Sequence, residues 1–534
     1  MRYHLSLKLL LEWTVLGIFF LLVFSAFMAC HGSEGDSSLP IEAIELAKSV
    51  DSGDLEVKVA STQPGSGVVW GKSSTAATPS TATPTVPNPA PALPAPSTAS
   101  SKPSALPAKQ SLPKNDSVET YLLKSGRQKG STDLVETLLE VTGEAVQVNS
   151  DLKEAKEKME VVAGFRYEEC TEQFSQTDQL VSVRQYNLAK SKMKVGESVK
   201  MPELASELQT IVCTLDRDKV SLFSPHGSLR GEQLLLIEDI PGNTLTLDRL
   251  LPNTKIAIGE SWKIGDAVLR SFLSVDAVLT SNVEAVLTSV ADNMAMIEMV
   301  GDVSGIYLGA TTEISVRAKL QFDLSAQRIN WLGAMIEENR SIGHVGPGVE
   351  LVAKLQVKIS PLDEPQALTE AAMKKINTKP NAGVLQLMYD GGKGPWRFSH
   401  DRAWYVYQDD PQATVLRRLV NGDLIAQCNV ADMGTVDLKT MTTLEKFQQD
   451  LIAGLGNNFG KVIAAEEYEN ERGFKIYKVL LEGTVDDLSL RWIYHLVTDK
   501  AGRQSVVVFV VEAAMIDQFG DADNALLEAY RMGR

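Results

Sequence analysis

The sequence predicts an α+β protein in which a β-rich domain with a curved antiparallel sheet precedes a smaller α/β sandwich. Three observations lead to this fold class. Residues 283–335 alternate between apolar and polar side chains with a period of two, which is typical of strands with one buried face. Residues 442–530 combine strand-like runs with two helix-like segments. Residues 1–115 instead hold an apolar segment and a proline-rich linker.

Residues 1–32 are predicted to direct the chain to a membrane, as a signal peptide or as an anchor. Residues 9–29 are mostly apolar, with Glu12 as the only charged residue, and about 20 apolar residues in a helix span a bilayer core of about 30 Å. Basic residues precede the segment and acidic residues follow it, so we expect the rest of the chain to lie outside the cytoplasm. This predicts an extracytoplasmic, membrane-associated protein of the periplasm or cell envelope, with a transmembrane helix if the segment is retained.

Three fates remain open for this apolar segment. Cys30 stands just after the apolar core and Ala29 directly precedes it, which resembles a bacterial lipoprotein signal, although Phe27 and Met28 depart from the usual pattern. The resemblance implies that lipid is attached at Cys30. Cleavage before Ser33 and retention as an uncleaved anchor are the two alternatives.

A linker separates the apolar segment from the folded domains. Residues 33–60 form a short juxtamembrane segment, and residues 61–115 are rich in Pro, Ala, Ser and Thr. Eleven of the 22 prolines of the chain lie between Pro64 and Pro113. This composition offers no apolar face whose burial would offset the entropy of ordering, so we predict a disordered spacer. A ligand for a proline-recognising domain is the functional alternative.

The overall composition is that of a soluble globular chain with an acidic surplus. The formal charge of −16 argues against a nucleic-acid partner, because binding to phosphates depends on clustered Lys and Arg. The chain has four cysteines, too few for a disulfide scaffold. Cys170 and Cys213 could pair in an oxidising compartment, but two separately buried thiols are the favoured interpretation.

The β-rich domain is predicted to span residues 116–361. We expect a strongly curved sheet or half-barrel with one or two helices across it, and helical turns at residues 245–251 and 267–275. If the sheet closes around a cavity, the domain could carry an apolar ligand. The adjacent Glu168 and Glu169 are interpreted as ordinary solvated charges. The alternation predicts three series of side chains that each share one face: Val283, Ala285 and Leu287; Val316, Ala318, Leu320 and Phe322; and Ile329, Trp331, Gly333 and Met335.

Residues 362–380 are predicted to connect this domain to the α/β sandwich of residues 381–534. A capping-box spacing from Thr442 to Glu445 predicts the start of a helix. Residues 488–496 alternate as a strand, and His495 is interpreted as a surface or edge residue. A last helix is expected to place its apolar side chains along one stripe: Phe519, Ala522, Leu526 and Tyr530.

The order of these elements resembles the PsbP/Mog1-like α/β sandwich. The features that carry the resemblance are the strand 424–430, the helix after Thr442, the strands at 491–494 and 508–512, and the helix at Phe519. The resemblance is one of pattern and brings no catalytic residues with it. It implies an accessory or binding module, although a fold by itself does not determine function.

The sequence contains no recognisable motif for catalysis or metal binding. Residues 67–73 end like a phosphate-binding loop but have three residues between the glycines where that motif needs four. The sequence has no HExxH motif, no paired CxxC and no G-x-S-x-G elbow. We therefore predict no catalytic residues, no cofactor and no metal ligands.

An aromatic cluster at residues 396–407 is the one candidate binding feature. Aromatic side chains on strands are more often part of the core, but rings with polar groups also favour binding surfaces. The candidate binding residues are Trp396, Trp404 and Tyr407.

Together these patterns predict a non-catalytic, membrane-tethered binding or envelope-assembly protein that acts on a protein or envelope partner. The motivation is the apolar segment, the spacer and the lack of catalytic motifs. Two alternatives remain: a carrier of an apolar ligand in the β-rich domain, and an enzyme whose acid–base residues are scattered along the sequence.

Overall fold

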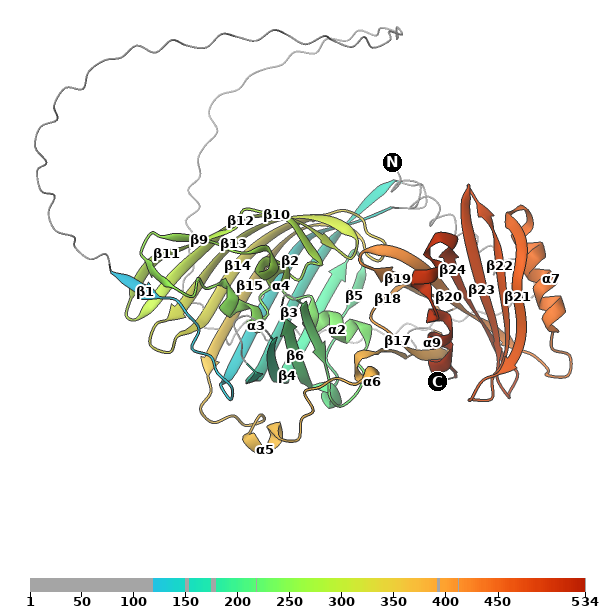
Figure 1. Ribbon diagram of the computed structural model, residues 1–534, viewed down its shortest axis with the longest axis horizontal. Helices are drawn as coiled ribbons and strands as arrows, with labels where there is room; N and C mark the ends of the chain where they lie inside the picture. The colour runs from blue at the N-terminus through green and yellow to red at the C-terminus, as the bar shows by residue number, and fades with distance from the viewer. Residues whose placement is uncertain are drawn as a thin grey trace, which may run out of the picture. The chain divides into compact units, whose positions relative to one another are not determined.

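The computed structural model describes residues 119–148, 153–173, 179–217, 219–390, 394–411 and 413–533. This part of the chain is strand-rich and forms several antiparallel sheets (Figure 1). The predicted membrane segment, Cys30 and the linker lie outside the described residues. Among the residues that are described, no helix has the length and apolarity needed to cross a membrane.

The largest sheet has 13 strands, and every neighbouring pair in it is antiparallel. In spatial order its main path is β7 (Lys219–Phe223), β6 (Thr210–Asp216), β4 (Gln179–Val195), β3 (Glu154–Gln173), β2 (Thr132–Val148), β15 (Gly348–Pro361), β14 (Arg328–Arg340), β13 (Ala310–Asp323), β12 (Met294–Tyr307), β11 (Glu284–Ala291) and β9 (Ser261–Lys263). Two further strands join it, β10 (Ala277–Ser281) beside β12 and β5 (Ser198–Lys200) beside β4. A separate pair consists of β1 (Thr120–Leu122) and β8 (Lys255–Ala257).

Alternating burial confirms the predicted curved sheet, with one exception. The predicted inner side chains of β11 and β13, such as Leu287, Leu320 and Phe322, are buried. In β14, however, Ile329, Leu332, Ala334 and Ile336 are the buried side chains. The prediction that Ile329 shares one face with Trp331, Gly333 and Met335 is therefore wrong. The cause is a β-bulge, described below, that changes the alternation after Ile329.

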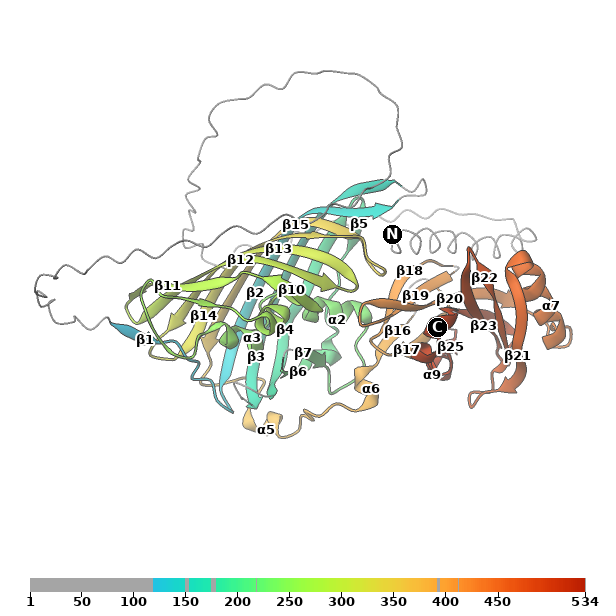
Figure 2. The same cartoon turned by 45° about the horizontal axis from the view of Figure 1, so that its top comes forward.

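Helices cover the concave side of this sheet (Figures 1 and 2). They are α2 (Gly231–Glu238), α3 (Thr244–Leu247), η2 (Asp248–Leu250) and α4 (Asp266–Leu273), and η1 (Ser206–Leu208) lies before β6. Leu234, Leu247, Leu269 and Phe272 share one buried core with the inner side chains of the strands. The two predicted helical turns are confirmed. A carrier for an apolar ligand would need the space that these helical side chains occupy.

Residues 362–385 cover part of the outer face of the same sheet. They include α5 (Glu370–Met373) and α6 (Ala382–Leu385), and Leu368 is buried among apolar side chains of β3, β4, β6 and β7. Glu168 on β3 is 5% exposed. Its carboxylate accepts hydrogen bonds from the backbone N–H groups of residues 366, 367 and 368, at 3.0, 3.0 and 2.9 Å. These three bonds fix the start of the connecting segment to the sheet.

The interpretation of Glu168 and Glu169 as solvated charges is wrong. Adjacent strand residues point to opposite faces, and here both faces are covered. Glu168 meets the connecting segment on the outside, whereas Glu169 is buried on the inside, where it accepts hydrogen bonds from Arg184 and Ser182 at 2.8 Å each.

Replacing Glu168 with glutamine is expected to loosen the connecting segment. The amide keeps one acceptor oxygen but loses the charge that strengthens bonds to N–H groups, and its NH₂ group faces donors. We expect the free energy of unfolding to fall by about 1–3 kcal/mol and amide exchange at residues 366–368 to accelerate. Urea unfolding and hydrogen exchange measure the two effects. Glu160→Gln, at an exposed position on the same strand, is the control, and equal exchange in both variants would contradict the role of Glu168.

The C-terminal residues form a seven-stranded sheet between two covering layers. Its order is β18 (Trp404–Asp409), β19 (Ala413–Val420), β20 (Asp423–Thr435), β24 (Arg503–Glu512), β23 (Leu488–Thr498), β22 (Lys475–Val485) and β21 (Phe459–Glu469). A three-stranded sheet consists of β16 (Leu387–Asp390), β17 (Trp396–His400) and β25 (Arg531–Met532). The helices are α7 (Leu444–Leu455), η3 (Gly456–Asn458), η4 (Ala513–Met515), α8 (Ile516–Phe519) and α9 (Ala522–Ala529).

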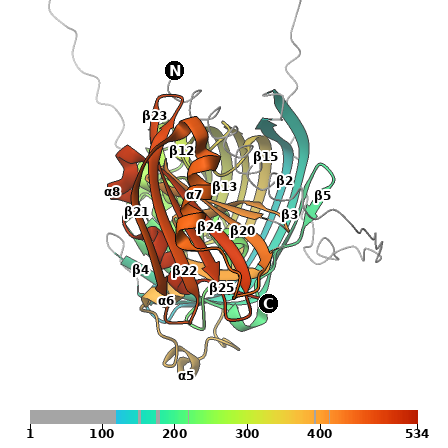
Figure 3. The same ribbon diagram turned by 90° about the vertical axis from the view of Figure 1, so that its right-hand side faces the viewer.

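α7 and α9 lie on opposite sides of the seven-stranded sheet (Figures 1 and 2), and Figure 3 shows α7 in front of that sheet. Leu451 and Leu455 of α7 pack with Trp492 on one face, while Leu526 of α9 packs with Phe509 on the other. The predicted helix after Thr442 is confirmed, but its N-cap is Thr443, whose side chain accepts a hydrogen bond from the N–H of Lys446 at 3.3 Å. The predicted last helix is broken at Gly520 into α8 and α9, so the four predicted side chains do not share one helix; Phe519, Leu526 and Tyr530 are nevertheless buried, as expected.

His495 lies inside this region and not at its surface. Its side chain is fully buried, and Nε2 lies 3.2 Å from a carboxylate oxygen of Asp523 on α9. The Nζ of Lys478 lies 2.8 Å from the same oxygen. Burial lowers the pKa of His495, whereas the pKa of Asp523, which burial alone would raise, is lowered to about 2 by its hydrogen bonds to His495 and Lys478. The predicted surface position is wrong because β23 is an inner strand whose face is covered by α9.

The cysteines of the described region are unpaired. Cys170 belongs to the outer apolar cluster beneath the connecting segment, while Cys213 belongs to the inner core of the same sheet. Both are buried free thiols, as is Cys428. The possible disulfide between Cys170 and Cys213 is therefore wrong, and the favoured interpretation of separately buried thiols is confirmed.

Candidate functional site: a cleft at the rim of the large sheet

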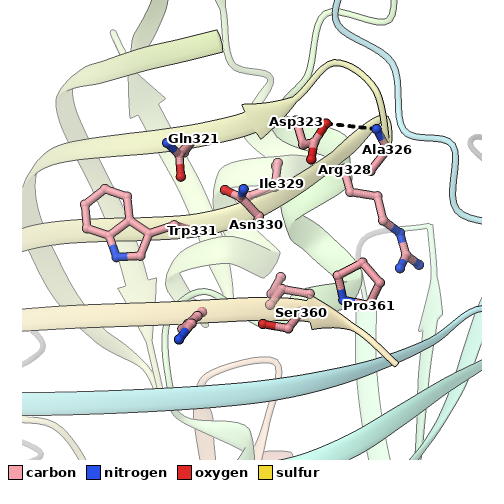
Figure 4. A pocket seen from close by; sticks show the side chains of 11 residues that line it. Gln321, Asp323, Ala326, Arg328, Ile329, Asn330, Trp331, Ser360 and Pro361 are labelled. Atoms are coloured by element: carbon pink, nitrogen blue, oxygen red, sulfur yellow. Dashed lines mark hydrogen bonds between the residues drawn. The ribbon is translucent and has the colours of Figure 1, made fainter. Parts of the chain in front are cut away.

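A cleft of about 320 Å³ lies where β13 ends, β14 begins and β15 ends (Figure 4). We call it the rim cleft. It is lined by Gln321, Asp323, Ala326, Arg328, Ile329, Asn330, Trp331, Lys358, Ile359, Ser360 and Pro361.

The register of three neighbouring strands places the main polar and aromatic groups of the rim cleft in one row. Trp331 of β14 is paired with Gln321 of β13 on one side and with Lys358 of β15 on the other. Asn330 is the extra residue of the β-bulge, since the next pair along β14 joins Ile329 to Phe322. The bulge turns Ile329 inward and leaves Trp331 on the outer face, which is how it shapes the site.

Trp331 lies along the outer face of β14, above a glycine. A Cβ atom built on Gly333 would come within 2.5 Å of the indole ring, so any larger residue at this position would displace the ring. The ring is partly exposed, and Figure 4 shows it beside Gln321 and Asn330. Gly333 therefore lets the indole lie close to the sheet as a flat wall of the cleft.

Two buried polar atoms of the cleft lining have no hydrogen-bond partner among the described residues. One is the amide oxygen Oδ1 of Asn330, an acceptor, and the other is Nη2 of Arg328, a donor. The amide nitrogen of Asn330 donates to the sulfur of Met294 at 3.6 Å, and Nη1 of Arg328 donates to Asp133. Both atoms have almost no accessible surface, so the polar groups that a bound molecule could reach from the cleft are those of exposed or partly exposed side chains such as Gln321, Lys358 and Ser360.

Arg328 is held by a buried network of three arginines and three carboxylates. Glu169 lies 2.8 Å from Arg184 and 3.9 Å from Arg127. Arg127 also lies 3.7 Å from Asp133 and 3.4 Å from Asp248. Burial raises the pKa of Glu169 by itself, but Arg184 and Arg127 outweigh it and lower that pKa to about 2. The network contains three arginines and three carboxylates, so its charges are equal in number. It holds Arg328 in place without adding a net charge to the cleft.

The structure does not bring the three predicted binding aromatics together on one surface. Trp396 and Trp404 are 1% and 3% exposed and belong to the core beside the seven-stranded sheet. Tyr407 is 44% exposed, and the guanidinium of Arg417 lies 3.5 Å from the centre of its ring. The remaining predicted site residue, Cys30, lies outside the described residues.

Sequence reasoning missed the rim cleft because its residues come from three strands and its bulge has no sequence signature. The run from Trp331 to Ile336 contains apolar residues in both phases of the alternation, so either face could be assigned to the core. The available signal was Gly333 beside Trp331, because a glycine within a strand often marks a bulge or a close approach.

Within the described ranges, no group of three or more His, Cys, Asp or Glu side chains is arranged to hold a metal ion. The cleft lining contains neither histidine nor cysteine. The lining instead offers an aromatic face together with amide, hydroxyl and charged side chains that can form hydrogen bonds.

Comparison with known proteins identifies no family. No family model matches the chain, and no curated protein matches it. Among solved structures, PsbP (CyanoP) from Synechocystis sp. PCC 6803 is similar to this chain. The match covers 29% of this chain and 98% of the PsbP chain, at 16% identity and a TM-score of 0.23. The protein of unknown function PA94 from Pseudomonas aeruginosa is also similar. Its match covers 27% of this chain and 94% of the PA94 chain, at 8% identity and a TM-score of 0.20.

A structure of lipovitellin is similar to a larger part of this chain, 45%, but this chain covers only 26% of lipovitellin, at 7% identity and a TM-score of 0.28. Likenesses with scores of this size establish neither a family nor a function. This chain is a strand-rich α+β protein with a cleft at the rim of its large sheet, and one of its structural neighbours is a PsbP protein.

Proposed function

We propose that this chain is a non-catalytic binding protein, held at a membrane by residues 1–32 and displayed in the periplasm or cell envelope on the linker of residues 61–115. The single observation that carries the binding role is the rim cleft. It combines the partly exposed indole ring of Trp331 with polar side chains that a ligand can reach, those of Gln321, Lys358 and Ser360. Such a combination of an apolar wall and a few directed polar groups is typical of ligand sites.

The carboxylates near the cleft are already engaged, which supports binding over catalysis. Asp323 accepts hydrogen bonds from the N–H groups of Ser325 and Ala326 at 2.8 and 2.9 Å, the latter drawn in Figure 4. Asp133 lies against Arg127 and Arg328. A general acid or base needs a free carboxyl group within reach of the substrate, and these two carboxyl groups instead hold a turn and an arginine in place.

The C-terminal sandwich is proposed to serve as an accessory module. Its sheet lies between α7 and α9, the arrangement expected from the PsbP/Mog1-like resemblance of the sequence. That resemblance implies a role in assembly or binding with a protein or envelope partner, and the acidic chain makes nucleic acid an unfavourable partner.

A photocrosslinking experiment in intact cells tests the binding role. A benzophenone amino acid at Ser360, which lines the cleft, is expected to capture a ligand that the same group at Lys354 does not capture. Lys354 is exposed on the same strand but does not line the cleft. Equal products from both positions, or none from either, would contradict binding at the cleft.

Two measurements test the membrane tether independently of the cleft. Alkaline phosphatase fused after residue 534 is expected to be active, because this enzyme matures only outside the cytoplasm. The intact mass of the protein extracted from membranes is expected to show an uncleaved chain or a chain that begins at Cys30 with added acyl groups. A reporter that is active only in the cytosol would contradict the proposed location.

A further inference from the structure

We infer that His495 makes the attachment of α9 to the seven-stranded sheet sensitive to acid, so that one proton added to this side chain loosens the helix. The device lies in the C-terminal sandwich and is independent of the rim cleft. Three features carry it: the burial of the imidazole, the charges around it, and a ring nitrogen that has no partner among the described residues.

The imidazole of His495 lies where the sheet and α9 meet. Ile493 and Val497, which share a face of β23 with His495, belong to the same core as Leu526 of α9. The rings of His495 and Phe509 are nearly perpendicular, with their centres 5.9 Å apart. The side chain is 0% exposed, so water reaches the imidazole only when α9 moves away from the sheet.

One carboxylate oxygen of Asp523 on α9 accepts from two nitrogen groups of the sheet. Nε2 of His495 lies 3.2 Å from this oxygen, and Nζ of Lys478 lies 2.8 Å from it. Because a carboxylate only accepts, the neutral imidazole donates its Nε2–H. Lys478 also donates to Oδ1 of Asn524, the next residue of α9, at 3.1 Å. These bonds attach α9 to β22 and β23, and with a neutral His495 the charges of Lys478 and Asp523 cancel.

Protonation of His495 would disturb this arrangement in two ways. It would place a second positive charge beside Lys478, with only Asp523 to compensate both, and a buried charge without compensation is costly. It would also turn Nδ1 into a charged donor, although this buried atom has no hydrogen-bond partner among the described residues. Burial accordingly lowers the pKa of His495 below its usual value of 6.5, and Lys478 adds to this effect against the opposing effect of Asp523.

The other titratable groups around the imidazole keep their charge in mild acid. Hydrogen bonds to His495 and Lys478 hold the pKa of Asp523 at about 2, so it stays ionised. Burial raises the pKa of the Cys428 thiol, and raises that of the Tyr468 hydroxyl to about 12, so both stay neutral. Glu466 of β21 is exposed, and solvent screens its charge. His495 is therefore the member of this cluster that responds to mild acid.

Acid is expected to favour the opened position of α9. Once α9 has moved away, His495 meets water and has the ordinary pKa of 6.5, whereas its pKa in the closed state is lower. The opened form then binds more protons than the closed form, so the attachment weakens as pH falls below 6.5. At pH 5 an accessible imidazole is about 97% protonated, which limits the gain in opening to about 30-fold.

Hydrogen exchange of the full chain in detergent, measured by mass spectrometry at pH 7 and pH 5, tests this device. Protection factors remove the direct effect of pH on exchange. We expect the protection of α9, residues 522–529, to fall about tenfold at pH 5, while α7 on the opposite face keeps its protection. His495→Gln can still donate to Asp523 but does not titrate, so its loss of protection is expected to stay below about threefold.

Lys478→Met separates the effect of the proton from a purely structural role of His495. Without the second cation, a protonated His495 forms a neutral pair with Asp523, so the loss at pH 5 is expected to shrink below about threefold. Lys475→Met removes an exposed charge of the same strand, 2.8 Å from Glu467, and is expected to keep the tenfold loss. Lys478→Met carries the test if thermal unfolding shows that His495→Gln is not folded. A loss below about threefold in the wild type, or equal losses in the wild type and His495→Gln, would overturn the inference.

Discussion

Replacing Glu169 with glutamine is expected to lower the free energy of unfolding by about 3–5 kcal/mol at neutral pH, because removing one member of a buried ion pair leaves the other charge without compensation. The carboxylate accepts the Nε–H of Arg184 at 2.8 Å and lies 3.9 Å from Arg127. Both arginine side chains are 5% exposed or less. Glutamine has nearly the same shape, so the change removes charge without creating a cavity.

Urea unfolding measures this loss, and Glu160→Gln on the exposed part of the same strand is the matched control. The control is expected to change stability by less than about 0.5 kcal/mol, as substitutions at exposed positions usually do. A loss below about 1 kcal/mol in Glu169→Gln would show that the pair behaves like a surface ion pair and would contradict the role assigned to the network.

The same residue makes a prediction about pH. Burial opposes ionisation of Glu169, but Arg184 and Arg127 outweigh it, so its pKa falls from the ordinary value of 4.5 to about 2 in the folded state. A depressed pKa in the folded state adds stability above the unfolded pKa and loses it as pH falls through the folded pKa. The wild type is therefore expected to lose this contribution between pH 4.5 and about 2, so its advantage over Glu169→Gln narrows in that window. An advantage that stays constant down to pH 2 would contradict the lowered pKa.

Replacing Trp404 with alanine is expected to cost about 3–5 kcal/mol of folding stability, the usual range for a large aromatic residue removed from a core. Its ring centre lies 5.9 Å from that of Phe509, and the guanidinium of Arg418 lies 5.6 Å from the ring. Tyr407→Ala is the comparison, because Tyr407 contributes an exposed ring and one stacked arginine, Arg417. We expect Tyr407→Ala to cost about 1 kcal/mol.

Chemical unfolding of both variants decides between the core and binding interpretations of these aromatic residues. If Trp404→Ala unfolds at nearly the same urea concentration as the wild type, Trp404 is not a core residue. If Tyr407→Ala unfolds at the same urea concentration as the wild type, Tyr407 does not contribute to the core, and the binding interpretation is kept for this residue.

Patterns within single elements were predictable from the sequence. The alternation in β11 and β13 assigned Leu287, Leu320 and Phe322 to the core, because a strand with one wet face imposes a period of two on its residues. The helix after Thr443 and the buried position of Leu526 followed from capping and helical spacing in the same way. Each of these signals is local, so neighbouring residues suffice to reveal it.

Features that depend on partners far along the chain were not predictable. Glu168 is buried by residues about 200 positions later, and His495 by Asp523 on a helix that covers its strand. Both residues are polar, and composition alone assigns polar residues to the surface. The bulge at Asn330 is local, but the apolar residues on both sides of β14 conceal it. The rim cleft depends on this concealed bulge and on two non-local features, the register of three strands and the anchoring of Arg328.

The placement of Cys170 and Cys213 on opposite sides of one sheet bears on how the protein matures. Their side chains are separated by the sheet itself, and each is sheltered in apolar surroundings. The described part of the chain thus reaches its native structure without thiol oxidation. We therefore expect this region to fold without enzymes that make or shuffle sulfur bridges, and purification in reducing buffer should give it the same structure as purification in air.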